Sequence, residues 1–183
     1  MKKIAILLIA SLFAVSATIQ AQTFKFGHLN VEELVMLMPD FDSLQVKVEK
    51  YQKDFMEMYN EMVEEATKKN NEYQQKNATW TAIVLEAKQK ELNDIIQRIQ
   101  SYEQRFNPEL QQYQQSLILP IYDKVQNAIK ELGTAENYTY ILDLSSSGGV
   151  FHFANEKTST NLMSKMKDKL GIPQSKQLPM QQQ

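Results

Sequence analysis

The residue types of a nucleophilic triad lie within ten positions of one another in the last third of the chain. They are Asp143, Ser145, Ser146, Ser147 and His152. A triad needs a serine on a rigid turn and a histidine hydrogen-bonded to its hydroxyl. Here the serines belong to a Ser-Gly segment, 145–149, of the composition that ordinarily forms a tight turn. The pattern therefore favours a turn over a hydrolase, and we do not expect an enzyme.

The metal-ligating residues are few and scattered. His28 and His152 are the only histidines, and the chain has no cysteine. Both histidines fall in segments that we expect to be strands, so pairing could bring them together. Two histidines without cysteine or a clear carboxylate partner make a poor zinc site. We expect core or rim histidines, no metal and no cofactor, and the lack of cysteine also excludes disulfides and thiol chemistry.

The charge balance is mildly acidic. The chain has 20 Lys and Arg against 22 Asp and Glu, a net charge of −2, and without Lys2 and Lys3 the balance becomes 18 − 22 = −4. This gives no basic footprint for nucleic acid, which we do not expect as a partner.

The first 21 residues have the pattern of an export signal. Lys2 and Lys3 precede an almost wholly apolar run, 4–15, and small and polar residues follow up to Ala21. Such a run is too short to span a bilayer comfortably and is typical of a cleaved signal. We expect cleavage after Ala21, with Ala17 as the alternative, and a mature chain that is soluble outside the cytoplasm.

A long helical hairpin is expected over residues 43–116. No glycine occurs between Gly27 and Gly133, and glycine is unfavourable in helix interiors. An apolar stripe with steps of four and three follows the repeat of a coiled coil: Leu44, Val48, Tyr51, Phe55, Met58 and Met62. The chain should reverse at 77–81 and return on a stripe that begins Leu92, Ile96 and Ile99. A fresh cap at Asn107 with Pro108 predicts a kink or break in the returning helix.

The flanking segments are expected to form a small β-rich body from 22–42 and 117–171. Residues 24–30 read as a strand, and Asn30 with Glu33 resembles a capping box for a short helix that ends before Pro39. The next helix should start at Asp40 or Asp42.

After the hairpin, Gly133 should end the returning helix. Residues 138–144 and 150–154 should form a hairpin of two strands. A last helix, capped by Asn155 or Thr158, should stop at Gly171, and we expect the tail, 172–183, to be disordered. The expected fold class is α+β. Because the body is small, it should need oligomerisation.

Three stretches of this chain resemble the Skp/OmpH family of periplasmic chaperones. They are GHLNVEELVMLMPDFD (27–42), LILPIYDKVQNAIKELGTAENYTYILDLS (117–145) and GGVFHFANEKTSTNLMSKM (148–166). The resemblance implies a homotrimer in which the strands form a central trimerisation body and three helical hairpins hang around a cavity as tentacles. Family members hold unfolded outer-membrane proteins in that cavity without ATP.

The resemblance leads us to expect an ATP-independent periplasmic holdase whose partners are unfolded outer-membrane β-barrel proteins and two further copies of itself. Transient contact with a membrane surface is an open alternative for the hairpin's end, and a structural coiled-coil scaffold or adaptor is the alternative function. The candidate trimer-body residues are Phe26, Leu29, Tyr140, Ile141, Leu142, Val150, Phe151 and Phe153.

The candidate client-binding residues are apolar side chains that exceed the needs of a helix seam or lie at the far end of the hairpin. They are Phe55, Met58, Tyr59, Met62, Trp80, Ile83 and Val84. Methionine-rich surfaces repack easily around varied partners. The alternatives are that the first four belong to the seam between the two helices and that the last three pack locally to close the turn.

Overall fold

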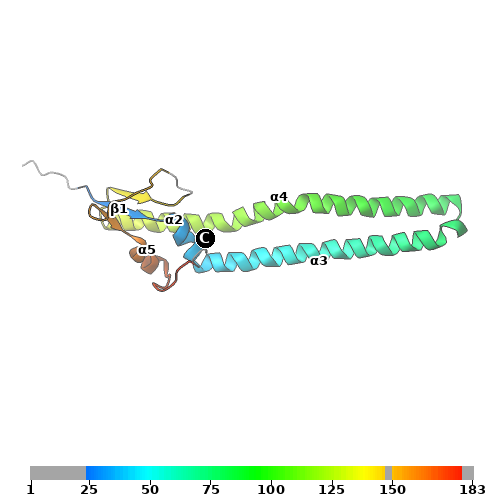
Figure 1. Ribbon diagram of the computed structural model, residues 1–183, viewed down its shortest axis with the longest axis horizontal. Helices are drawn as coiled ribbons and strands as arrows, with labels where there is room; N and C mark the ends of the chain where they lie inside the picture. Colours follow the sequence, from blue (N-terminus) through cyan, green and yellow to red (C-terminus); the bar gives the residue numbers. More distant parts are fainter. Residues whose placement is uncertain (1–23, 147–149, 179–183) are drawn as a thin grey trace, which may run out of the picture.

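The computed structural model describes residues 24–146 and 150–178, so the predicted signal peptide lies outside the described residues. Two long helices run side by side out of a small body that holds the strands and the short helices (Figure 1). The mixed body and protruding helical hairpin confirm the main outline of the predicted α+β fold.

The body contains one three-stranded parallel sheet. Its strands are β1 (Phe26–Leu29), β2 (Tyr140–Asp143) and β3 (Ser159–Asn161), in the order β2-β1-β3. Phe26 pairs with Tyr140 on one side and with Ser159 on the other, and both pairings are parallel. Parallel neighbours need a crossover connection, and the whole helical hairpin is the crossover from β1 to β2.

The predicted β-hairpin over 138–154 is wrong. Residues 150–154 form no strand, and the third strand lies further on, at β3. The alternation of Val150, Phe151 and Phe153 suggested a half-buried strand, but all three side chains are exposed. β3 instead pairs through its backbone, and the Leu162 amide beyond it donates to the carbonyl of His28 at 2.9 Å. The residues 147–149 of the expected turn lie outside the described ranges.

The short helix α2 (Val31–Leu37) begins as predicted. The Asn30 side chain accepts a hydrogen bond from the Glu33 amide at 2.9 Å. Met38 is extended before Pro39, as residues before proline usually are. Pro39 then opens α3 (Pro39–Lys76), so the expected start at Asp40 or Asp42 is slightly late. The carboxylates of Asp40 and Asp42 lie in the first turn of α3, where their negative charge interacts favourably with the positive end of the helix dipole.

The chain reverses where predicted, at η2 (Asn77–Thr79), before α4 (Ala82–Ala135) returns. Of the kink or break predicted at Asn107, the break is wrong, because α4 is unbroken through Pro108. The helix does bend on its way to the body (Figure 1). Phe106 packs with a tilted ring on Phe55 at 4.1 Å, and Tyr113 stacks on Tyr51 at 4.9 Å, measured between centroids. These ring contacts hold the helix in place on either side of Pro108. They offset the loss of the one backbone hydrogen bond that proline cannot donate.

Of the other predicted helix ends, one is confirmed and the rest are wrong. α4 passes Gly133 and ends at Ala135, and Asn137 adopts the left-handed conformation with φ 57°. α5 (Met163–Leu170) stops as expected at Gly171, which has φ 69°. Leu162 is the N-cap of α5, so the expected caps at Asn155 and Thr158 are wrong.

The core lies between the sheet, α2, α5 and the body end of α4. Its most deeply buried large side chains are Leu29, Leu34, Leu37, Met38, Leu162 and Met166. Ile172 also belongs to this core at 3% exposure, and Lys176 forms an ion pair of 2.6 Å with Asp42. The start of the predicted disordered tail therefore packs on the body, because an apolar residue follows the Gly171 turn and reaches the core.

Candidate binding surfaces of the hairpin

The seam between α3 and α4 is built on stacked aromatic rings. The Phe55 ring lies 4.3 Å from Tyr102 and 4.1 Å from Phe106, measured between centroids. Closer to the body, Tyr51 stacks on Tyr113, and its hydroxyl donates to the Glu109 carboxylate at 3.3 Å. Phe55, a candidate client contact, thus lies in the seam.

The other candidate client contacts on the stalk, the part of α3 and α4 between the body and the tip, lie partly in the seam and partly in solvent. Met58 is 47% exposed, whereas Tyr59 and Met62 are half-buried, with the Tyr59 ring stacked beside Phe55.

The predicted apolar stripe of the returning helix needs one correction, because Ile95 is buried at 3% and Ile96 is exposed at 41%. From Leu92 the seam advances by three residues and then by four, which keeps the heptad spacing.

Further from the body the seam becomes polar. Lys69 of α3 contacts Glu91 of α4, and Lys88 also reaches Glu91 at 3.2 Å. Arg98 pairs across the helices with Glu65 at 3.2 Å. Hydrogen bonds from Lys69 and Lys88 lower the pKa of the Glu91 carboxyl below its ordinary value. The outer part of the hairpin is therefore joined by solvated ion pairs on either side of the buried Ile95.

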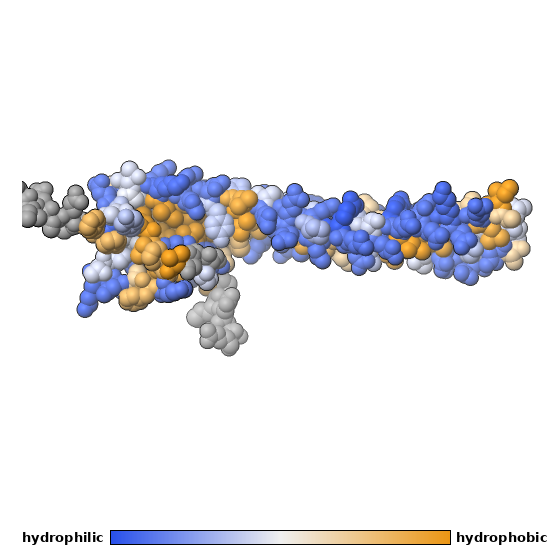
Figure 2. All heavy atoms as spheres, turned by 90° about the horizontal axis from the view of Figure 1, so that it is seen from above, coloured by the Kyte–Doolittle hydropathy of each residue, from blue (hydrophilic) through white to orange (hydrophobic). Residues whose placement is uncertain are grey.

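The tip, defined as residues 77–85, combines a packed ring with exposed aliphatic side chains. Trp80 is half-buried and meets the Tyr73 ring edge-on at 6.0 Å. Ile83 is 81% exposed and Val84 is 38% exposed. Figure 2 shows this hydrophobic colour at the end of a mostly hydrophilic stalk. Trp80 closes the turn, and the two aliphatic residues are available to a partner.

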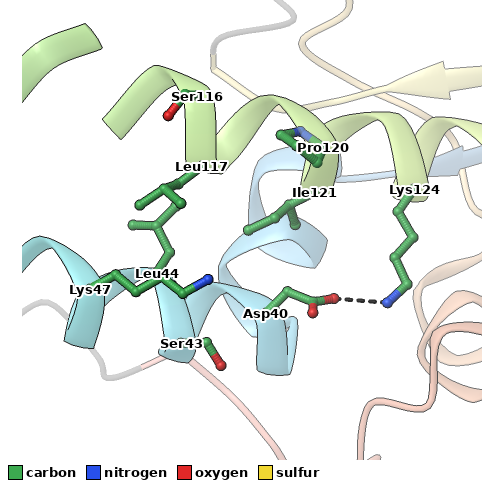
Figure 3. A pocket seen from close by; sticks show the side chains of 9 residues that line it. All are labelled: Asp40, Ser43, Leu44, Lys47, Ser116, Leu117, Pro120, Ile121 and Lys124. Atoms are coloured by element: carbon green, nitrogen blue, oxygen red, sulfur yellow. Dashed lines mark hydrogen bonds and ion pairs between the residues drawn. The ribbon is translucent and has the colours of Figure 1, made fainter. Parts of the chain in front are cut away.

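A charged pocket lies at the root of the hairpin, where α3 and α4 leave the body (Figure 3). It measures about 310 Å³. Leu44, Leu117 and Ile121 form its apolar part, and Asp40 Oδ2 pairs with Lys124 Nζ at 2.8 Å across it. This ion pair ties the start of α3 to α4.

A second, larger cavity lies at the same root, and we call it the glutamine groove. It measures about 690 Å³. Four apolar side chains, Phe41, Leu44, Val48 and Ile118, line it together with Glu49 and four glutamines, Gln45, Gln111, Gln114 and Gln115. Our sequence reasoning missed this groove. The signal was the run of glutamines on α4 opposite apolar residues of α3, but its use required knowing how the two helices are rotated.

The body exposes a set of apolar residues around the sheet. Tyr140 is 63%, Val150 is 76% and Phe153 is 77% exposed, and the Phe26 ring stacks on Tyr140 at 6.1 Å. Phe151 is also exposed, Ile141 and Leu142 are half-buried, and Phe24, which sequence reasoning missed, is 61% exposed. Leu29 is only 2% exposed and packs in the chain's own core. The candidate trimer-body set therefore combines exposed and half-buried residues, and Leu29 alone among them is buried within the chain.

Two of the residues with triad chemistry, Asp143 and Ser145, form hydrogen bonds that hold the end of β2. Asp143 Oδ1 accepts hydrogen bonds from the amides of Val31 and Ser145, at 3.1 and 2.9 Å, and Oδ2 accepts from the Ser145 hydroxyl at 2.9 Å. This carboxylate joins the end of β2 to the first turn of α2. His152 is exposed, and Ser147 lies outside the described residues.

The two histidines lie in different environments. His28 is buried in β1, where its Nδ1 lies 3.0 Å from the Ser159 hydroxyl, whereas His152 is exposed. In ranges 24–146 and 150–178, no group of three or more histidine or carboxylate side chains is arranged to hold a metal ion. In the same ranges, no helix has the length and apolar content to cross a bilayer.

The chain has known relatives at the level of family and fold. The family model described as outer membrane protein (OmpH-like) matches residues 25–170. Among solved structures, an OmpH-like candidate outer membrane chaperone from Caulobacter crescentus CB15 superposes with a TM-score of 0.66 at 13% sequence identity. The match covers 80% of this chain and 83% of that one, and at this identity it establishes the fold alone. A comparison with curated proteins gave no match.

Proposed function

This chain belongs to the OmpH-like outer membrane protein family, and we propose that it is an ATP-independent holdase for unfolded outer-membrane proteins in the periplasm. The observation that carries the proposal is a long helical hairpin that exposes apolar side chains at its tip and root. The periplasmic location rests on the predicted export signal, 1–21.

Weak contacts at several places suit a holdase. Complete burial of one apolar side chain is worth roughly 1.5–3 kcal/mol, and partial contact is worth less. Ile83, Val84 and the glutamine groove would each hold a client loosely. Such contacts keep client chains from meeting one another, and the client leaves when its own folding in the membrane is more favourable.

We further propose a homotrimer assembled through the body. Phe24, Tyr140, Val150 and Phe153 are all more than 60% exposed, and a body of this size has a small core of its own. Light scattering of the mature protein should give about three times the subunit mass. Replacing residues 60–94 with a short glycine-containing turn should leave that ratio unchanged, and a monomeric wild type would contradict the proposal.

The function is tested by aggregation of a bacterial outer-membrane β-barrel protein diluted from urea. The purified mature chain should suppress light scattering by the client without ATP. The double variant Ile83→Ser and Val84→Ser should suppress it less well. A matched variant, Met56→Ser and Ile96→Ser, changes two exposed apolar residues that lie away from both the tip and the root and should retain more activity. Absence of suppression by the wild type would refute the holdase.

A structural scaffold or adaptor is the second candidate. The hydrophilic stalk and its cross-helix pairs, Lys69 with Glu91 and Arg98 with Glu65, suit a spacer surrounded by water (Figure 2). A scaffold would be trimeric or otherwise assembled but would leave client aggregation unchanged, so the same assay separates the two functions.

A further inference from the structure

We propose that the glutamine groove binds one extended segment of an unfolded polypeptide, with an apolar side chain on its floor and the backbone against its amides. This inference rests on the proposed holdase function and assigns it a specific subsite. The groove's volume of about 690 Å³ falls within the range of about 300–1,000 Å³ usual for binding pockets.

The floor offers apolar surface that the chain itself leaves partly uncovered. Phe41, Val48 and Ile118 pack against the core as partly buried residues and also line the groove. An apolar side chain placed there would displace water from all three. The floor therefore favours segments that carry leucine, valine or aromatic residues.

The rim matches a peptide backbone. A glutamine amide both donates and accepts hydrogen bonds, and an extended chain presents unpaired N–H and C=O groups that need such partners. Gln111 and Gln115 lie one helical turn apart on α4, about 6 Å along its axis. Two residues of an extended chain span about 6.6 Å. Backbone groups that point to the same side of the segment would thus recur at the spacing of these amides.

Charge separates this groove from the pocket beside it. Glu49 is the single charged residue in its lining, whereas Asp40, Lys47 and Lys124 line the smaller pocket. The Glu49 carboxylate disfavours acidic segments, and the uncharged glutamines accept alternating apolar and polar ones. Strands of transmembrane barrels have that alternation, so an unfolded barrel strand is the occupant that fits best.

The test replaces rim amides with carboxylates, which accept hydrogen bonds but cannot donate. The variant carries Gln111→Glu, Gln114→Glu and Gln115→Glu. Its matched control carries Gln100→Glu, Gln104→Glu and Gln112→Glu, which add the same charge to exposed positions of α4 outside the groove. The probe is a fluorescent, terminally blocked peptide of alternating apolar and Thr residues, followed by anisotropy, with helical circular dichroism as the check on folding.

We expect the groove variant to bind this peptide about tenfold more weakly and the control to bind within twofold of wild type. Equal binding by all three proteins, or equal weakening in both variants, would overturn the groove as the subsite. If the wild type also fails to suppress client aggregation, the holdase function itself is wrong. If aggregation is suppressed equally by all three, only the groove assignment fails.

A photo-crosslinker gives a second, direct readout. Benzoylphenylalanine is introduced at Gln115 or at the next residue, Ser116, which lines the charged pocket instead. We expect the peptide to be captured from position 115 and not from position 116. Capture of a second copy of this chain from position 115 would show that the groove is an interface between copies, and that result also overturns the proposal.

Discussion

Truncation of Phe55 should loosen the stalk rather than remove a client contact. Its ring is half-buried and lies within 4.3 Å of Tyr102 and within 4.1 Å of Phe106, centroid to centroid. Complete burial of such a side chain is worth roughly 1.5–3 kcal/mol, so half-burial gives about 1 kcal/mol. Each close ring pair adds about 0.5–1.5 kcal/mol. Phe55→Ala should therefore cost the stalk about 2–4 kcal/mol.

Native-state hydrogen exchange measures this cost locally. A loss of about 2–4 kcal/mol corresponds to a decrease of about 30- to 900-fold in the protection of amides around positions 55 and 102. Amides of α2 and of the sheet should keep their protection, because the body has its own core.

Met58→Ala is the control, one turn further along α3 and 47% exposed. Exposed substitutions usually change stability by less than about 0.5 kcal/mol, so protection should fall by less than about threefold. Equal effects of the two substitutions, or a Phe55 effect below threefold, would refute the reasoning that this ring stack holds the hairpin together.

Asp143→Ala should destabilise the body by about 2–3 kcal/mol in urea denaturation, because the carboxylate accepts hydrogen bonds from two amides and a hydroxyl. Gly27→Ala should cost about 1–3 kcal/mol, since the added Cβ would lie 2.5 Å from Leu162 Cδ1; a shorter side chain at Leu162 should recover part of the loss. Hydrogen bonds from Lys165 lower the pKa of Glu136 from its ordinary 4.5, so this pair stabilises the fold above that pH and less as pH falls through the lowered value. The melting temperature of Lys165→Met should accordingly change less than that of wild type below about pH 4.5.

The helices could be predicted from the sequence because their signals are local. Absence of glycine, heptad spacing and the Asn30 cap each act over a few residues, and they gave the hairpin, its reversal and the start of α2. The sheet could not be predicted in the same way. β3 has the sequence Ser-Thr-Asn and no apolar pattern, and it pairs with β1 across more than 130 positions of sequence.

The candidate site shows the same division. Ile83 and Val84 are exposed as a tip without a core requires. The heptad position of Phe55 does not tell whether its ring lies in the seam or on the surface. The positions of Tyr102 and Phe106 show that it lies in the seam. The glutamine groove depends on the rotation of α3 against α4, which residue spacing along one helix does not fix.

The distance between the two proposed contact regions gives the hairpin a way to select unfolded chains. From Gln45 in the groove to the end of α3 at Lys76 there are roughly 30 residues of helix, or about 45 Å. A folded domain of 100 residues has a radius of gyration of about 13 Å, whereas the same chain unfolded has about 30 Å. The unfolded chain can reach the groove and the tip together. Once one contact has formed, the second forms within the same complex at a higher effective concentration, so overall binding is tighter. A folded domain reaches one region at a time, so its binding stays as weak as a single contact.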